Sequence, residues 1–63
     1  MSTLTRTGVF ARPEQVERIR AAHMTMPKSE RQQVVYACAL ACGLPEIEGY
    51  YSCDLVTGEF VRS

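Results

Sequence analysis

Three cysteines and one histidine are the side chains of this sequence that best suit metal binding or nucleophilic catalysis. Cys38 and Cys42 are four residues apart, which would place both thiols on one face of a helix. With Cys53 and His23 they match the ligand set of some structural zinc sites, although the cysteine pairs of such sites usually lie in loops or knuckles. The run Ala-Cys-Ala-Leu-Ala-Cys favours core packing instead, because a free cysteine packs as a small apolar residue. We therefore predict reduced thiols and no metal or cofactor.

Catalysis by the same residues is not predicted. His23 would need a nucleophile or an acid within reach, and apolar surroundings raise the pKa of a thiol and make it unreactive. Glu46 and Glu48 stand on an open loop, and the sequence has neither a glycine-rich phosphate loop nor a serine nucleophile elbow. We expect a protein that is not an enzyme. One catalytic alternative stays open, a subunit whose active site forms between chains with Cys53 or His23.

The N-terminal half predicts a strand and a helix. The segment Thr3–Ala11 is rich in β-branched residues, and Gly8 within it suits a bulge. Pro13 is typical of the first turn of a helix, and Pro27 ends that helix because it disfavours helical geometry in the residue before it. The helix should turn one apolar stripe towards the core, formed by Val16, Ile19, His23 and Met26.

A second helix has signals at both ends. Ser29 followed by Gln32 fits a capping box at its start. At its end, Gly43 can adopt the left-handed conformation that closes a helix, and Pro45 prevents continuation. The stretch between these signals, Val34–Cys42, is apolar on all sides, which predicts burial on more than one side.

The tail from Gly49 to Ser63 predicts a β-hairpin, with Asp54 and Gly58 supplying the turn. The order of elements is then β-α-α-β-β. This order indicates an α+β fold in which a small antiparallel sheet packs on a helical hairpin.

Length and composition favour one small folded domain, residues 1–63. Hydrophobic residues make up 46% of the 63-residue chain, which opposes disorder. An odd number of cysteines opposes a disulfide scaffold. The first six residues lack the apolar core of a signal peptide, and no apolar run is long enough to span a bilayer. We expect a complete cytoplasmic protein that does not enter a membrane.

The two halves of the chain carry opposite charges. Six basic and three acidic side chains give residues 1–31 a net charge of +3, whereas one basic and four acidic side chains give residues 32–63 a net charge of −3. The basic first helix, with Arg12, Arg18 and Arg20, makes a small DNA-associated regulator one alternative. The zero net charge of the chain opposes this alternative. So does the acidic stretch after Gly43, which would repel phosphates in the place of a helix-turn-helix recognition helix.

The favoured function is protein interaction. A chain of this size rarely encloses a small-molecule pocket, so we predict an adaptor, accessory subunit or inhibitor, such as phages and plasmids encode. Tyr36, Tyr50 and Tyr51 are of the residue type that anchors interfaces. Because adjacent strand residues face opposite ways, one of Tyr50 and Tyr51 should be exposed. We also expect a homodimer that forms through the small residues of the second helix, with Ala39 in the contact.

Overall fold

The predicted α+β fold and its β-α-α-β-β order are confirmed by a computed structural model, which describes residues 4–62. The elements are β1 (Thr5–Phe10), α1 (Pro13–Thr25), α2 (Lys28–Ala41), β2 (Tyr51–Cys53) and β3 (Glu59–Arg62). Thr3, the first residue of the predicted N-terminal strand, lies outside the described residues.

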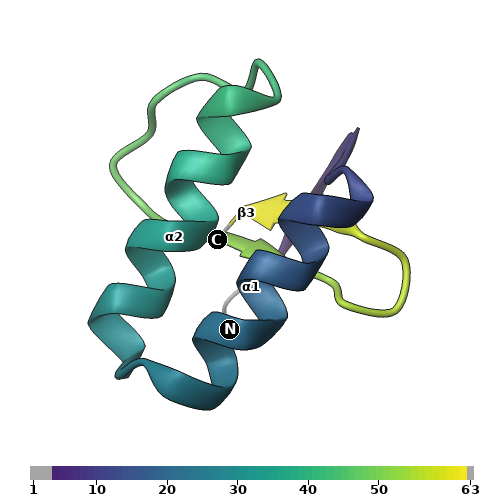
Figure 1. Cartoon of the computed structure of the whole chain (residues 1–63). Coiled ribbons are helices and arrows are strands. Elements are labelled where there is room, and N and C mark those ends of the chain that lie inside the picture. Colours follow the sequence, from purple (N-terminus) through teal and green to yellow (C-terminus); the bar gives the residue numbers. More distant parts are fainter. Residues whose placement is uncertain (1–3, 63) are drawn as a thin grey trace.

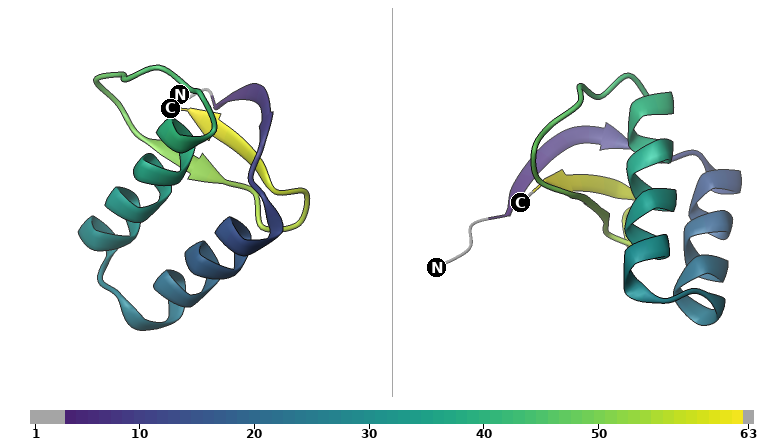
Figure 2. Two further views of the ribbon diagram at one scale, coloured as in Figure 1. Left: turned by 45° about the horizontal axis from the view of Figure 1, so that its top comes forward. Right: turned by 90° about the vertical axis from the view of Figure 1, so that its left-hand side faces the viewer.

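The three strands form an antiparallel sheet in the order β1-β3-β2, so the last strand of the chain is the central one. Both helices lie on the same side of the sheet as a hairpin that is joined at its tip (Figure 1). Figure 2, right, shows the two layers edge-on. A loop of residues 44–50 leads from the end of α2 to β2.

The core lies between the hairpin and the sheet. Ile19 of α1, Tyr51 of β2 and Phe60 of β3 are its largest fully buried side chains. Val35, Cys38 and Ala39 of α2 complete the cluster. Burial of these apolar surfaces is the main stabilising contribution in a fold of this size.

Local signals at the helix ends explain most of the element boundaries. Pro13 occupies the first turn of α1, as predicted, and the backbone N–H of Arg12 donates to Gln15 Oε1 over 2.8 Å. Gly43 closes α2 with a φ of +93°, and the backbone N–H of Leu44 donates to the carbonyl oxygen of Ala39 over 3.1 Å. This is the Schellman arrangement that a Gly-Leu-Pro sequence favours.

The capping box predicted at Ser29 is wrong. The helix already begins at Lys28 after Pro27, and no side chain caps it. Proline fixes an extended conformation at the cap position without offering a side-chain acceptor. Ser29 therefore lies inside the first turn and is exposed.

The predicted inner stripe of α1 is partly wrong. Ile19 is fully buried and Val16 is half-buried, but His23 and Met26 are exposed. The small side chain of Ala22 takes the inner position in the last turn instead. The helices meet closely at their joined ends, so a small residue fits there and the larger His23 is turned outward.

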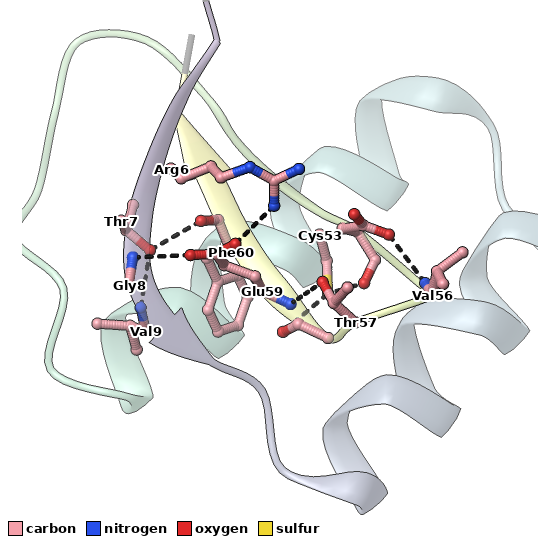
Figure 3. A network of polar contacts seen from close by, with 11 residues as sticks. Arg6, Thr7, Gly8, Val9, Cys53, Val56, Thr57, Glu59 and Phe60 are labelled. Carbon is pink, nitrogen blue, oxygen red and sulfur yellow. Dashed lines mark hydrogen bonds and ion pairs between the residues drawn. The ribbon is translucent and has the colours of Figure 1, made fainter.

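Glycines and an aspartate shape the strands as predicted. Gly8 has a φ of +75°, and the pairing of β1 with β3 shifts register there, between Arg6 and Phe10. In the β2–β3 turn, Asp54 accepts a hydrogen bond from the backbone N–H of Val56 at 2.9 Å, and Gly58 has a φ of +82° (Figure 3).

Candidate interaction surface

The outward side of α2 is a narrow ridge between two shallow apolar grooves. Gln33 and Ala37 form the ridge, since both border each groove. They stand on the side of the helix opposite to Val35 and Ala39, which are buried. We call the ridge and both grooves the α2 face. The predicted burial of α2 on several sides therefore applies to its inner half, whereas Ala37 and Ala41 are exposed.

The first groove lies between the two helices and has a volume of about 420 Å³. Met26 and Arg18 of α1 border it on one side, and Glu30 and Val34 of α2 on the other. Arg18 is exposed, so its guanidinium is available on this flank.

The second groove lies between α2 and the 44–50 loop and has a volume of about 480 Å³. Tyr36 and Leu40 border it on the helix, and Ile47 and Tyr50 border it on the loop. The Tyr36 hydroxyl accepts from the backbone N–H of Ile47 over 2.9 Å and is 3.2 Å from the carbonyl oxygen of Ile47, to which it donates. The hydroxyl of Tyr51 donates a hydrogen bond to the carbonyl oxygen of Pro45 in the same loop, at 2.6 Å. These bonds fix the outer wall of the groove.

The two flanks of the α2 face carry opposite charges. Arg18 lies on the α1 flank. Glu46 and Glu48 lie in the 44–50 loop on the other flank, and both are exposed. Figure 1 shows α2 between α1 and this loop. Arg18 and the two loop carboxylates therefore lie on opposite sides of α2, and Glu30 of α2 borders the groove on the Arg18 side.

Tyr50 and Tyr51 differ in exposure, since Tyr50 ends the 44–50 loop and Tyr51 begins β2. Tyr50 is 56% exposed, whereas Tyr51 is 2% exposed and belongs to the core. Their neighbour Tyr36 is half-buried, and its ring lies 5.6 Å from that of Tyr51. Tyr36 and Tyr50 meet at one groove of the α2 face, and Tyr51 supports it from inside.

Ala39, predicted as a contact residue, is 0% exposed and cannot touch a partner of the folded chain. The groove-lining residues that the sequence interpretation missed are Gln33 and Ile47, whereas Ala37 is one of the small residues that it assigned to the contact. Gln33 could have been found from its spacing of four to Ala37, because this spacing places both on one helix face half a turn away from Val35.

The predicted basic residues do not form one patch. Arg12 is at the start of α1, and Arg12, Arg18 and Arg20 are all exposed. Glu14 and Glu17 of the same helix are exposed as well. The outer surface of α1 therefore carries both signs of charge, which gives a nucleic-acid backbone little continuous attraction.

The cysteines and the histidine do not assemble into a metal site within residues 4–62. Cys38 is buried, Cys42 and Cys53 are half-buried, and all three thiols are free. Desolvation by burial is the main cause that raises the pKa of both Cys38 and Cys53. Such thiols are poor nucleophiles at neutral pH. His23 is exposed, and its Nδ1 is 3.2 Å from Nη1 of Arg31.

One buried carboxylate was not foreseen from the sequence. Glu59 at the start of β3 is 8% exposed. Its oxygens accept from Arg6 Nη1 at 2.6 Å and from the backbone N–H of Gly8 at 3.1 Å (Figure 3). Because these groups hold β1 to β3, we assign the cluster a structural role.

Among the described residues, no helix is long and apolar enough to cross a bilayer. No protein-family model, curated protein or solved structure matches the chain. The functional argument therefore rests on the α2 face and its chemistry.

Proposed function

We propose that this chain is a non-catalytic protein-interaction module that binds through the α2 face, and that the partner on this face is a second copy. The observation that carries the proposal is the Gln33–Ala37 ridge, which separates two apolar grooves. Arg18 borders one groove, and the exposed Glu46 and Glu48 lie in the loop beside the other. The small side chain of Ala37 on the exposed ridge permits close approach of a second helix, and Tyr50 offers the large aromatic surface that anchors interfaces.

Charge complementarity selects the second copy and its orientation. A copy rotated by 180° about an axis parallel to α2 has its two flanks exchanged. The α1 flank of each copy, with Arg18, then lies over the acidic loop of the other copy, with Glu46 and Glu48. A two-fold axis that lies in the plane of the face and perpendicular to α2 would instead place the α1 flanks of the two copies over each other, and the acidic loops likewise. Like charges would then meet. We therefore propose a symmetric dimer with parallel α2 helices, which closes on itself as two-fold assemblies do.

Charge reversal provides a direct test of this arrangement. The Arg18→Glu variant and the double variant Glu46→Lys, Glu48→Lys should each be monomeric in sedimentation at tens of micromolar, whereas the wild type should be dimeric. All three residues are exposed, so both variants should fold. Mixed in equal amounts, the two variants should form a heterodimer, because both flanks are then attractive again.

Arg20→Glu is the matched control, since Arg20 is exposed on α1 but does not border the α2 face. It should dimerise like the wild type. Dimers of either charge-reversed variant alone, or a mixture that stays monomeric while the wild type is dimeric, would contradict the parallel arrangement. A wild type that is monomeric at all concentrations would exclude the second copy as the partner.

A further inference from the structure

A second hollow lies beside the α2 face, where the end of α1, the start of α2 and β2 meet, and it shares only Gln32 with that face. It has a volume of about 220 Å³. Its lining includes three side chains that are cationic or become so on protonation, His23, Lys28 and Arg31. Gln32 and Ser52 add neutral hydrogen-bond donors, and no aspartate or glutamate borders it. Such a lining favours an anion.

Arg31 carries an unused hydrogen-bond donor. The guanidinium can only donate, so Nδ1 of His23 is the acceptor in their contact of 3.2 Å. Nε of Arg31 is buried, and no acceptor contacts it among residues 4–62. A buried donor without an acceptor is unfavourable. An oxyanion that draws Nη1 away from His23 would turn the guanidinium and engage its planar fork through two parallel bonds.

The edge of the sheet adds to the site. β2 is an edge strand, so part of its backbone N–H groups point away from β3. Residues Tyr51, Ser52 and Cys53 of this strand line the hollow. Backbone amides, a hydroxyl, an ammonium and a guanidinium are the donors that proteins use for phosphate groups.

We propose that this hollow binds the phosphate group of a small phosphate monoester. Several cationic side chains suit a dianion better than a monovalent carboxylate. A water molecule takes about 30 Å³ in the liquid, so the hollow has room for a phosphate group and a small attached moiety. The cationic residues of the site, Lys28 and Arg31, do not border the α2 face.

The proposal is tested by NMR titration of the whole chain with inorganic phosphate, O-phosphoserine and acetate at constant ionic strength. The amides of Tyr51 and Cys53 and the ring of His23 should shift with saturation in the low millimolar range for both phosphate compounds, and at least tenfold more weakly for acetate. Binding of inorganic phosphate without binding of O-phosphoserine would overturn the monoester assignment. Equal shifts with acetate, or shifts that do not saturate, would overturn the site.

Variants separate this site from general charge attraction. Arg31→Gln should weaken phosphate binding at least tenfold. Lys28→Gln should weaken it about threefold, and it provides a second readout in an exposed residue if Arg31→Gln does not fold. Arg20→Gln is the control, because it removes one exposed positive charge outside the hollow. Binding that falls as much in Arg20→Gln as in the other two variants would overturn the proposal.

Discussion

Two alanines of α2, two positions apart, have opposite environments. Ala39 is fully buried in the core, whereas Ala37 is exposed on the ridge of the α2 face. A charge placed at position 39 would be buried without a partner, and this costs more than the 3–5 kcal/mol, roughly, that a chain of this length derives from its core. A charge at position 37 stays in water.

We therefore expect Ala39→Glu to be unfolded at 25 °C and Ala37→Glu to fold with a stability within about 0.5 kcal/mol of the wild-type monomer. Circular dichroism during thermal melting distinguishes the two variants, provided that both are compared with the wild type at a low, monomeric concentration. A folded Ala39→Glu variant would show that the core can open at this position.

The buried thiols predict a slow and pH-dependent reactivity. Desolvation by burial raises the pKa of Cys38 and Cys53, so little thiolate is present at pH 7.5. We expect alkylation of both residues by iodoacetamide to be at least about tenfold slower than in the urea-unfolded chain. Peptide mapping by mass spectrometry identifies each site. Equal rates in the folded and the unfolded chain would contradict the burial of these thiols.

The same shifts link stability to pH. A raised thiol pKa means that the folded chain holds the proton more tightly than the unfolded chain does. This contribution to stability is complete below the ordinary thiol pKa of about 8.5 and is lost as the pH rises through the folded value. Urea midpoints should therefore fall between pH 7.5 and 9.5, and they should fall less in a Cys38→Ala variant, in which one of the two raised thiols is absent.

At the scale of elements, one carboxylate adds to the backbone pairing that attaches β1 to β3. Glu59 joins the central strand both to the side chain of Arg6 and to the bulge at Gly8. Hydrogen bonds to a charged group contribute about 1.5–3 kcal/mol when one partner is lost, so Glu59→Gln should lower the free energy of unfolding by about that amount. Arg6→Gln should cost less, since the bond to Gly8 remains. Chemical denaturation of both variants checks this order, and a larger loss in Arg6→Gln would contradict it.

In the β2–β3 turn, the backbone conformation of Gly58 disfavours a side chain more than the space around this residue does. A Cβ added at Gly58 would meet its nearest atoms, in Ala11 and Val16, at 3.7 Å, which is an ordinary contact. The φ of +82° is what penalises a side chain there. We expect Gly58→Ala to destabilise the fold by about 1–2 kcal/mol. Gly49→Ala is the control without a positive φ and should not destabilise. Equal melting temperatures for the two variants would contradict this explanation.

The elements could be predicted from the sequence wherever the signal is local. Pro13, the Gly43 helix end and the Asp54–Gly58 turn are all determined by residues within a few positions of one another, and all three were correct. The hydrogen bond between Arg6 and Glu59 joins residues that are 53 positions apart, and nothing in the sequence pairs them. The inward turn of Ala22 in place of His23 depends likewise on how closely α2 approaches.

For the candidate surface, too, local features could be predicted from the sequence and tertiary contacts could not. The exposure of one residue in the Tyr50–Tyr51 pair came from the alternation of a strand and is confirmed. Which side of α2 faces outward could not be decided within a run that is apolar on all sides. The groove at Tyr36 exists because its hydroxyl holds the loop at Ile47, which is a tertiary contact.

At the scale of the whole molecule, one basic residue of the N-terminal half and two acidic residues of the C-terminal half lie on opposite flanks of one face. Arg18 and the acidic 44–50 loop are separated by the width of α2, so within one chain they attract each other little. In the proposed dimer, Arg18 of each copy lies over the acidic loop of the other copy, which gives two attractive contacts. Exposed pairs of this kind weaken as salt screens them, with a screening length of about 10 Å at 0.1 M salt and 3 Å at 1 M. Apolar contacts in the grooves are not weakened by this screening.

Self-association through this face also adds to the stability of a small core. A dimer that unfolds to separate chains becomes more stable as the protein concentration rises. We expect the melting temperature of the wild type to increase by several degrees between about 10 and 300 μM at low salt, and to increase less at 0.5 M salt. Ala37→Glu should melt at the same temperature throughout, because its ridge cannot approach a second helix. A wild-type melting temperature that does not change with concentration would contradict the dimer. An increase of equal size in Ala37→Glu would instead place the contact on another surface, of which the free edge of β2 is the first to test.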